Sequence, residues 1–564
     1  MPPPHRIQNW QEAVIAKRQT RSSKIPKAHL LPPDLAKRAS QGLLLPSSPE
    51  ILQCGILTRL DIEITSISDA AILRQRIAER EYSAVAVVTA YTKRASIAQQ
   101  TVNCLTEILY DDALERARRL DSVLEQTGSP LGILHGLPIS LKDLFAVKGV
   151  HATAGLASWI PNISSEDSTV TKNILAAGGI IYAKTNVSQG HLMVESINNV
   201  FGTTGNPHNP ALSAGGSSGG EAALLGALGG IIGSATDGGG SIRFPAAFCG
   251  TWGVKCSKGR IGTMGIESPG DGNESTNGGL GPVARSVEGC EMWLQAQLAT
   301  RAWEWDFTCL PMPWKAEEAK RTEKRLVVGV VWDDGVVRPT PPVRRAVAIV
   351  VELLKRAGHT VVELPEEEIK SLHRRGTACV MKSNVQGGGV GIMKHIDASG
   401  EPVVPRTATG SPASLLTTHE VFANHKERAG LSREYNSLWT RYNLDTILAP
   451  AVAHPAPPHG KYISNAYAGI YNMLDFVTGS VPVTTVDLEK DVADKEWYEA
   501  PAYERIEEER FPYDWGDREM KEVYTGPAVF ENAPVGVQIV CRRLREEKCV
   551  GILKELEALL KEAE

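Results

Sequence analysis

Two serines in glycine-rich surroundings have the properties of a nucleophile and its partner. Ser217 lies within Gly215–Gly220 (GGSSGG), and Ser241 follows three successive glycines. Glycines let the backbone turn sharply and approach a ligand closely. A serine directly after such a turn is well placed to attack a carbonyl carbon while backbone N–H groups hold the carbonyl oxygen. The N–H groups that can converge on this oxygen are those of Gly238, Gly239, Gly240 and Ser241.

A serine nucleophile needs a base, and none of the thirteen histidines lies in a recognisable partner motif. Lys142 does, because it ends the apolar run in Gly136–Asp143 (GLPISLKD). A buried lysine prefers its neutral form and can then accept a proton. The more ordinary role of a lysine at a strand end is that of a salt-bridge partner. If Lys142 is the base, we expect the neighbouring Asp143 carboxylate to point away from it.

Three other interpretations of the glycine-serine segment are weaker. A flexible linker would lack the apolar stretch Ala222–Leu228, which predicts a helix that Ser217 or Ser218 could cap. The G-x-S-x-G spacing of an α/β-hydrolase nucleophile elbow is present, but no apolar strand precedes it. A phosphate-binding P-loop needs Gly-Lys-Ser/Thr, whereas Gly220 is followed by Glu221.

The composition excludes several classes of protein. A net charge of −5 over 564 residues provides no basic surface for nucleic acid. The nine cysteines form no CxxC pair and no zinc-site spacing, so we expect reduced thiols in a cytoplasmic protein and no bound metal. The N-terminus lacks the apolar run of a signal peptide, and no segment reaches the roughly 18 uninterrupted apolar residues of a membrane span.

Short apolar runs alternate with amphipathic segments after residue 130, and this alternation predicts an α/β fold. The helices include Thr169–Ala177 and Val343–Ala357, and residues 7–85 are mostly helical and polar. From the alternation we expect a buried, largely parallel sheet. The predicted strands are Leu137–Leu141, Gly179–Ala183, Gly230–Ala235, Leu326–Val331, Thr360–Leu364, Thr446–Ala449 and Val535–Val540.

Two polar regions interrupt this alternation. Glu267–Gly281 reads as a glycine-rich loop. Asp487–Glu522 is strongly charged, but its aromatic residues argue against disorder and predict an ordered surface excursion.

The segment Gly215–Ala246, with its 24-residue spacing between Ser217 and Ser241, resembles the signature of the amidase signature family. The GLPISLKD segment resembles the family's lysine motif, and the N-terminal segments are similar to the fungal acetamidase branch. The resemblance extends from about residue 55 to the end of the chain. It implies a large mixed β-sheet core with helices on both sides. It also implies one large α/β/α domain over residues 86–564, preceded by a mostly helical extension over residues 1–85.

The resemblance assigns roles residue by residue. Ser241 would form the acyl-enzyme, Ser217 would relay the proton from a cis peptide with Gly216, and Lys142 would be the general base. The oxyanion would be held by the N–H groups of the residues from Gly238 to Ser241. His191 falls where relatives place a pocket-lining residue, although a hydrogen-bonded core histidine is the more ordinary interpretation. We expect segments such as Met381–His395 and Ala449–Thr485 to complete the acyl pocket.

The function implied by the resemblance is hydrolysis of a small-molecule carboxamide, without a metal or organic cofactor. Relatives are often homodimers. Three alternatives stay open: a glutamine-dependent amidotransferase subunit that needs a partner protein, a membrane-associated lipid amidase, and a binding protein without catalysis. The acidic balance counts against the first, the missing anchor against the second, and the intact Lys142, Ser217 and Ser241 against the third.

Overall fold

The computed structural model describes residues 5–563 apart from 271, 323, 463 and 507–515. An eleven-stranded sheet forms its centre, in the order β1-β3-β2-β6-β8-β7-β12-β13-β11-β9-β10. The strands of this sheet are β1 (Leu105–Ile108), β2 (Pro138–Lys142), β3 (Ile180–Thr185), β6 (Ile232–Asp237), β7 (Trp252–Lys255), β8 (Gly279–Ala284), β9 (Val327–Val330), β10 (Thr360–Glu363), β11 (Thr446–Pro450), β12 (Val477–Thr485) and β13 (Pro534–Cys541). A separate small ribbon pairs β4 (Ile197–Asn198) with β5 (Gly202–Thr203).

The sheet is mixed, so the expectation of a largely parallel sheet was wrong. Parallel pairs join β3 to β2 and β2 to β6, and again β11 to β9 and β9 to β10. Antiparallel pairs join the strands between these two blocks and add β1 at one edge. The strands that the sequence pattern missed, β1, β7, β8 and β12, all pair antiparallel. They are short or contain glycine and proline, so no continuous apolar run marked them.

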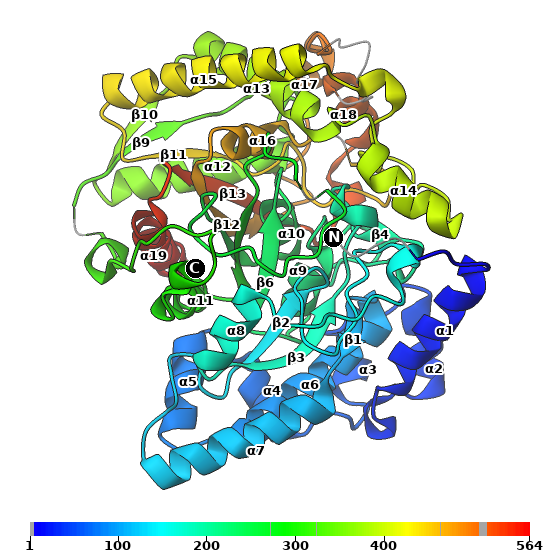
Figure 1. Cartoon of the computed structure of the whole chain (residues 1–564). Helices are drawn as coiled ribbons and strands as arrows, with labels where there is room; N and C mark the ends of the chain where they lie inside the picture. Colours follow the sequence, from blue (N-terminus) through cyan, green and yellow to red (C-terminus); the bar gives the residue numbers. More distant parts are fainter. Residues whose placement is uncertain (1–4, 271, 323, 463, 507–515, 564) are drawn as a thin grey trace.

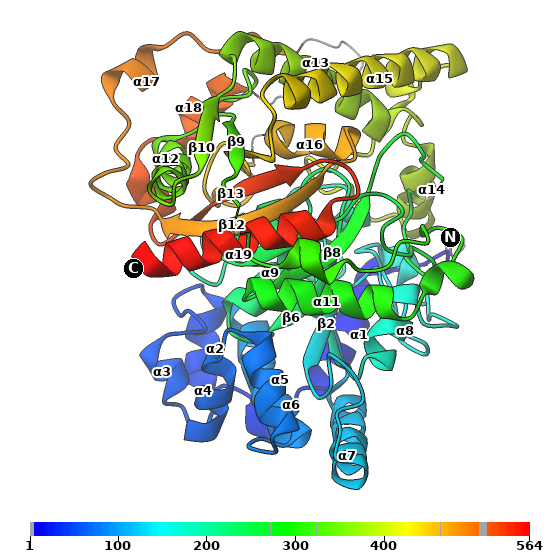
Figure 2. The same cartoon turned by 90° about the vertical axis from the view of Figure 1, so that its left-hand side faces the viewer.

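Helices cover both faces of the sheet, as expected (Figures 1 and 2). One face carries α9 (Gly219–Gly226) and α10 (Arg243–Cys249), and a Cβ on Gly253 of β7 would meet Ile242 and Ala246 at α10. The opposite face carries α11 (Val287–Ala299), α12 (Pro341–Arg356) and α19 (Glu546–Ala563), and Gly479 of β12 faces Leu553 of α19. Figure 2 shows α11 and α19 lying side by side.

The N-terminal region is helical, as predicted, and lies at the base of the view in Figure 1. The long helix α6 (Ala84–Val102) is at the centre of this region: α2, α4 and α7 pack against it, and it contacts β2 of the sheet. Helix α1 contacts β1. Where one domain ends and the next begins stays a prediction. The helices here are α1 (Trp10–Ser23), α2 (Pro33–Ser40), α3 (Pro49–Leu52), α4 (Arg59–Ser66), α5 (Ala70–Ala78), α6 (Ala84–Val102) and α7 (Tyr110–Thr127), followed by α8 (Thr169–Ala176) beyond β2.

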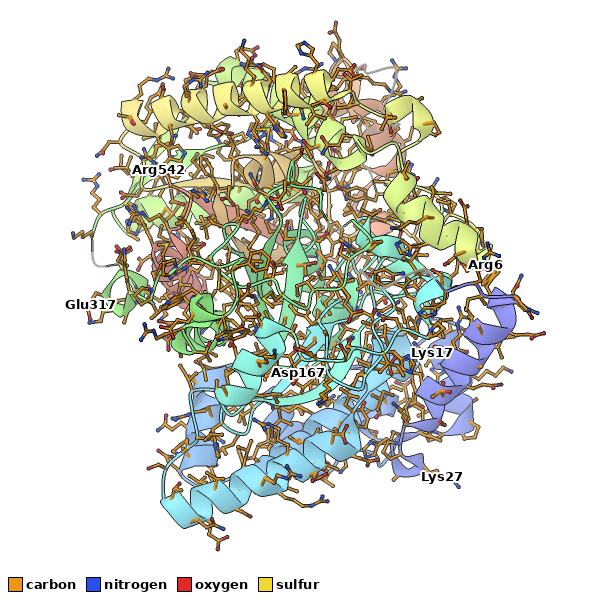
Figure 3. All side chains as sticks on the ribbon, in the orientation of Figure 1. Arg6, Lys17, Lys27, Asp167, Glu317 and Arg542 are labelled. Atoms are coloured by element: carbon orange, nitrogen blue, oxygen red, sulfur yellow. The ribbon has the colours of Figure 1, made fainter. Side chains whose placement is uncertain are left out.

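A second group of helices covers the other end of the sheet, with α15 across the top of Figure 1. Side chains fill the space between these helices and the strands (Figure 3). The helices of this group are α13 (Glu366–Val385), α14 (Val390–Ser399), α15 (Thr418–Arg441), α16 (Ala466–Met473), α17 (Lys495–Glu499) and α18 (Asp517–Val523).

The charged excursion at 487–522 is ordered in its described part. Trp497 of α17 is buried, and its Nε1 donates to the Pro339 carbonyl at 3.1 Å. Phe511 and Trp515, on which the expectation also rested, lie outside the described residues.

All nine cysteines are free thiols, as predicted. Within the described parts of the chain, no helix combines the length and apolar character that crossing a bilayer requires.

Candidate active site

Lys142 is the last residue of β2, and its side chain is fully buried. Its Nζ lies 2.7 Å from Ser217 Oγ and 2.7 Å from Thr236 Oγ1, so among the described residues the lysine is hydrogen-bonded to two hydroxyl groups and to no carboxylate. Burial lowers the pKa of Lys142 to about 7, although the charges of Asp237 and Glu221 oppose the shift. A lysine in this state holds a substantial neutral fraction near pH 7 and can accept a proton.

Asp143 points away from Lys142, as expected. Its carboxylate accepts hydrogen bonds from Thr106 Oγ1 at 2.8 Å, from the Thr153 N–H at 2.8 Å and from the Ala154 N–H at 2.7 Å. The carboxylate is thus bonded to these donors and not to Lys142. The neighbouring acid in the sequence therefore does not hold the proton on the base.

A second buried carboxyl group, Glu221 of α9, lies near the base. Its oxygens accept hydrogen bonds from Ser140 Oγ at 2.6 Å and from Thr185 Oγ1 at 3.0 Å. Gly233 leaves the room it needs, because a Cβ there would lie 2.1 Å from Glu221 Oε2. Burial raises the pKa of Glu221 to about 8. A protonated Glu221 leaves Lys142 free to lose its proton, whereas a carboxylate would hold it.

Ser217 and Ser218 lie at the turn into α9, and the Gly216–Ser217 peptide is cis, as the resemblance implied. Gly216 is required by the packing, since a Cβ there would lie 2.5 Å from the Glu195 nitrogen. Ser218 occupies the N-cap position of α9, but its hydroxyl donates to the Thr236 carbonyl at 3.3 Å and accepts no hydrogen bond from the N–H groups of the helix. The expectation that a serine side chain caps this helix was therefore wrong.

Ser241 lies in the loop between β6 and α10, which is held by a buried ion pair. Arg243 Nη2 lies 2.9 Å from Asp237 Oδ1, and both side chains are fully buried. Burial by itself would raise the pKa of Asp237, but the Arg243 charge and its hydrogen bonds keep that pKa well below its usual range. Arg243 also donates to the Ala468 carbonyl, to Gln538 Oε1 and to Asn472 Oδ1. The loop is thereby fixed to α16 and β13.

The backbone donors of this loop differ from the predicted oxyanion set in one member. The Gly240 N–H donates to Asp237 Oδ1 at 2.7 Å, so it is already occupied within the loop. Gly238 and Gly239 line the cavity together with Ser241, and in the described part of the chain their three N–H groups have no protein acceptor. The donors that stay available are those of Gly238, Gly239 and Ser241.

Ser241 and Ser217 line the same cavity, but no hydrogen bond joins their hydroxyl groups. Among the described residues, Ser241 Oγ has no partner, while Ser217 Oγ is held by Lys142. Catalytic hydrogen bonds are often long before substrate binds and shorten in the complex. The Lys142–Ser217 half of the predicted triad is in place, and Ser241 stands free to meet a ligand.

The cavity has a volume of about 620 Å³, which suits a ligand much larger than a two-carbon amide. Its walls come from segments far apart in the sequence. As expected, Met381–His395 contributes to them, and Tyr462 and Asn465 come from the second expected segment. The apolar lining residues are Leu144, Leu192, Met193, Val194, Ile266, Leu280, Met381, Val385 and Ile392.

His191 lines this cavity and is also hydrogen-bonded, so the two interpretations of it do not exclude each other. Its Nε2 lies 2.6 Å from Ser268 Oγ in the loop that the sequence marked as irregular. Burial lowers the pKa of His191 to about 3, with a smaller contribution from the Lys142 charge. The imidazole is therefore neutral at the pH values where Lys142 titrates.

Several residues of the site escaped the sequence analysis. Gln538 and Asn472 hold Arg243, and a glutamine within the apolar strand β13 was a signal that could have been used. Ser268, Asn273 and Thr276 line the cavity and lie in the segment predicted as the loop 267–281. The last three residues of that segment, Gly279–Gly281, belong to β8 and not to a loop. Asn277 of this loop donates to the Met473 carbonyl at 3.1 Å.

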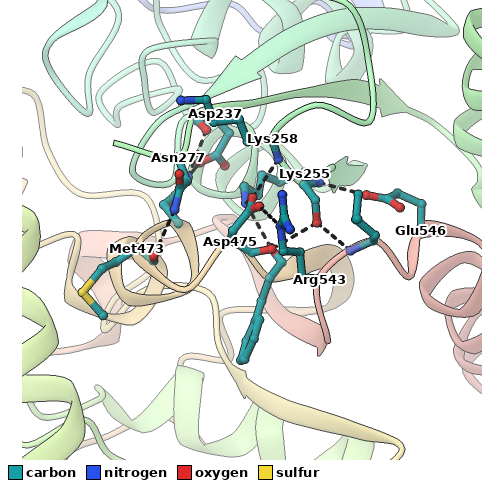
Figure 4. A network of polar contacts seen from close by, with 12 residues as sticks. Asp237, Lys255, Lys258, Asn277, Met473, Asp475, Arg543 and Glu546 are labelled. Atoms are coloured by element: carbon teal, nitrogen blue, oxygen red, sulfur yellow. Dashed lines mark hydrogen bonds and ion pairs between the residues drawn. The ribbon is translucent and has the colours of Figure 1, made fainter. Parts of the chain in front are cut away.

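A network of polar contacts around Asp475 lies close to Asn277 and Met473 (Figure 4). The Asp475 carboxylate accepts from the Lys258 N–H at 2.7 Å and from Arg543 Nε at 2.5 Å. Lys255 Nζ donates to the Phe476 carbonyl at 3.0 Å. These contacts join the turn between α16 and β12 to the ends of β7 and β13.

No group of three His, Cys, Asp or Glu side chains within the described residues has the arrangement of a metal site.

Comparison with known proteins adds independent evidence. The Amidase family model matches residues 86–550. An acetamidase of Emericella nidulans is 34% identical over 98% of this chain and 98% of its own. The putative amidase kk1C of Curvularia clavata is 34% identical over 96% of this chain and 97% of its own.

Among solved structures, a fatty acid amide hydrolase superposes with a TM-score of 0.89 at 32% identity, covering 98% of this chain and 95% of its own. This superposition confirms the predicted amidase signature fold, and the fungal relatives confirm the resemblance to the acetamidase branch. The chain therefore belongs to the amidase family of hydrolases.

Proposed function

We propose that this protein hydrolyses a carboxamide C–N bond through an acyl-enzyme, with Ser241 as nucleophile, Ser217 as proton relay and Lys142 as general base. The observation that carries the proposal is the 2.7 Å contact between Lys142 Nζ and Ser217 Oγ at a fully buried lysine. A buried amine whose partners are hydroxyl groups is suited to take a proton, and within the described chain no carboxylate is hydrogen-bonded to Lys142.

The reaction proceeds in two halves. Neutral Lys142 takes the proton of Ser217 while Ser217 takes that of Ser241, and Ser241 Oγ attacks the amide carbon. The proton returns through Ser217 to the nitrogen as the C–N bond breaks, because an amine anion is a poor leaving group. Water then attacks the acyl-enzyme with the same base and releases the carboxylic acid. The products are the acid and ammonia or an amine.

The negative charge that develops on the carbonyl oxygen is held by backbone donors. The N–H groups of Gly238, Gly239 and Ser241 are available for this purpose, and Gly240 shapes the loop by donating to Asp237. Neutral His191, fixed by Ser268, is proposed to contact the substrate from the opposite wall.

A second candidate function is hydrolysis of a long-chain amide. Two observations favour it: the cavity is mostly apolar, and a structure similar to this one is named a fatty acid amide hydrolase. No observation of this structure favours an amidotransferase subunit that depends on a partner protein. The cytoplasmic location, the homodimer and the lack of nucleic-acid partners stay predictions.

Labelling with a fluorophosphonate probe tests the proposal directly. Wild type is expected to be labelled at Ser241, and Ser241→Ala is expected to lose both the label and the release of ammonia from a panel of short, long-chain and aryl amides. Ser218→Ala is the matched control, because it is expected to keep the label. Labelling of Ser218 in the wild type would refute the proposal.

A further inference from the structure

A single positively charged side chain lies among the described residues of the cavity wall. Arg406 comes from the loop between α14 and α15, and no carboxylate in the described chain lies within ion-pair distance of it. The one acidic residue of the described wall, Asp237, is taken up by Arg243. Among the described residues of the wall, Arg406 therefore has no acidic partner and no further carboxylate is available.

The loop that carries Arg406 is fixed to the cavity at both ends. The Val404 N–H donates to Gln189 Oε1 at 2.8 Å, and the Ala408 N–H donates to the Leu192 carbonyl at 2.9 Å. Arg406 is exposed to solvent, and its Nη1 donates to the Tyr462 carbonyl. The guanidinium is thus held at the cavity wall with further N–H donors uncommitted.

A series of contacts connects Arg406 to the loop between β6 and α10, which carries Ser241. The Tyr462 ring lies 5.8 Å from that of Phe244, which packs beneath Gly240. Asn465, three residues after Tyr462, is 7% exposed and lies against Gly239, where its Nδ2 is 3.2 Å from the position of an added Cβ. Asn465 Oδ1 is buried and has no partner among the described residues. The wall therefore presents one unsatisfied polar atom, Asn465 Oδ1, in a side chain that lies against Gly239.

We propose that the preferred substrates carry a carboxylate on the acyl part, as in the monoamide of a dicarboxylic acid, and that Arg406 binds this carboxylate. The inference rests on the proposed function. A planar guanidinium matches a carboxylate with two parallel hydrogen bonds. The apolar residues that line the same cavity as Ser241 and Arg406 suit the methylene chain that separates the two polar ends. Asn465 adds a polar contact beside the scissile amide.

The test compares two amides that differ only at the far end: hexanamide and adipic acid monoamide. Ammonia release is measured for wild type, Arg406→Gln, Arg406→Lys and, as a matched control, Lys461→Gln, which removes an exposed cation outside the described cavity wall. Wild type is expected to prefer the monoamide in kcat/KM. Arg406→Gln is expected to lose about tenfold on the monoamide and to change hexanamide little. Arg406→Lys is expected to keep part of the preference, and Lys461→Gln all of it.

The outcomes separate this inference from the proposed function. If wild type cleaves hexanamide as well as the monoamide, or if Arg406→Gln lowers both rates equally, Arg406 is a structural residue and the inference is wrong. The same conclusion follows if wild type cleaves other amides through Ser241 but not the monoamide. If no amide of any class is cleaved, the proposed function itself fails.

Discussion

The two sides of the cavity are built in different ways. The side with Lys142, Ser217 and Ser241 comes from β2, β6 and the turns into α9 and α10. Two pairs on this side are buried and bonded, Lys142 with Ser217 and Arg243 with Asp237, whereas the Ser241 hydroxyl has no partner among the described residues. The opposite side comes from separate segments, including Leu192–Val194, the loop 267–281 and the end of α13, and parts of it are exposed.

This difference suggests that one side of the cavity carries out the proposed reaction and the other side selects the substrate. A buried network in which each group has its partner is costly to alter, because removing one member leaves the others unsatisfied. In an apolar wall built from several segments, a single substitution removes only the apolar contacts of that one side chain. Such a wall can therefore change without disturbing its other residues. We therefore expect changes on the catalytic side to affect all substrates, and changes on the opposite side to affect some substrates more than others.

The largest effect is expected from Lys142→Arg. An arginine cannot lose its proton, so kcat for any amide should fall by about 10²- to 10⁴-fold while the charge is kept. Lys184→Arg is the matched control, since Lys184 is also fully buried at the end of the neighbouring strand and donates to the His151 carbonyl. Thermal melting checks that both variants fold. Near-wild-type amide hydrolysis by Lys142→Arg would exclude the lysine as the base.

Comparing Gly240→Ala with Gly238→Ala tests how tightly the loop that carries Ser241 is packed. Gly240 has φ +121°, and an added Cβ would lie 2.0 Å from the Phe244 ring, so we expect a loss of about 2–4 kcal/mol in unfolding free energy together with most of the activity. Gly238 has no neighbour within 4 Å of an added Cβ, so Gly238→Ala should keep its melting temperature. Equal stability of the two variants in a denaturant titration would contradict this account of the loop.

The pH dependence should report Lys142. Its pKa is lowered to about 7, so the neutral base is scarce below pH 7 and predominant above it. The rate kcat/KM should therefore fall about tenfold per pH unit below pH 7 and level off above it. Glu221 raises the Lys142 pKa only when it is ionised, and its own pKa of about 8 keeps it mostly protonated near pH 7. Glu221→Gln should therefore leave this limb in place or move it slightly to lower pH. A shift to higher pH would show that Glu221 acts in another way.

The smallest effect is expected on the apolar wall. Met381→Ala shortens a side chain that lines the cavity, and we expect kcat/KM to fall about threefold to tenfold for long acyl chains but to change little for acetamide. Met264→Ala, at an exposed methionine outside the described cavity wall, should change neither substrate. An equal loss on short and long amides would place Met381 with the catalytic side and remove the distinction between the two walls.

Elements with a strong local pattern were predictable. The helices α8 and α12 and the parallel strands β2, β3 and β6 lie within a few residues of their predicted bounds, because continuous apolar runs and helical spacing are local properties. The strands β8 and β12 were not predictable in this way. Their glycines and prolines lower the intrinsic preference for a strand, and pairing with long-range partners overrides it.

The sequence by itself determined the candidate chemistry of this protein. The positions of Lys142, Ser217 and Ser241 within their motifs, and the glycines around them, follow from local backbone requirements that can be read along the chain. Only the tertiary structure decided that Asp237 occupies the Gly240 N–H, that Gln538 and Asn472 hold Arg243, and that Arg406 lies without an acidic partner in the described cavity wall. The physical reason is distance along the chain: these contacts join residues from separate strands and loops, and no local pattern specifies which of them will meet.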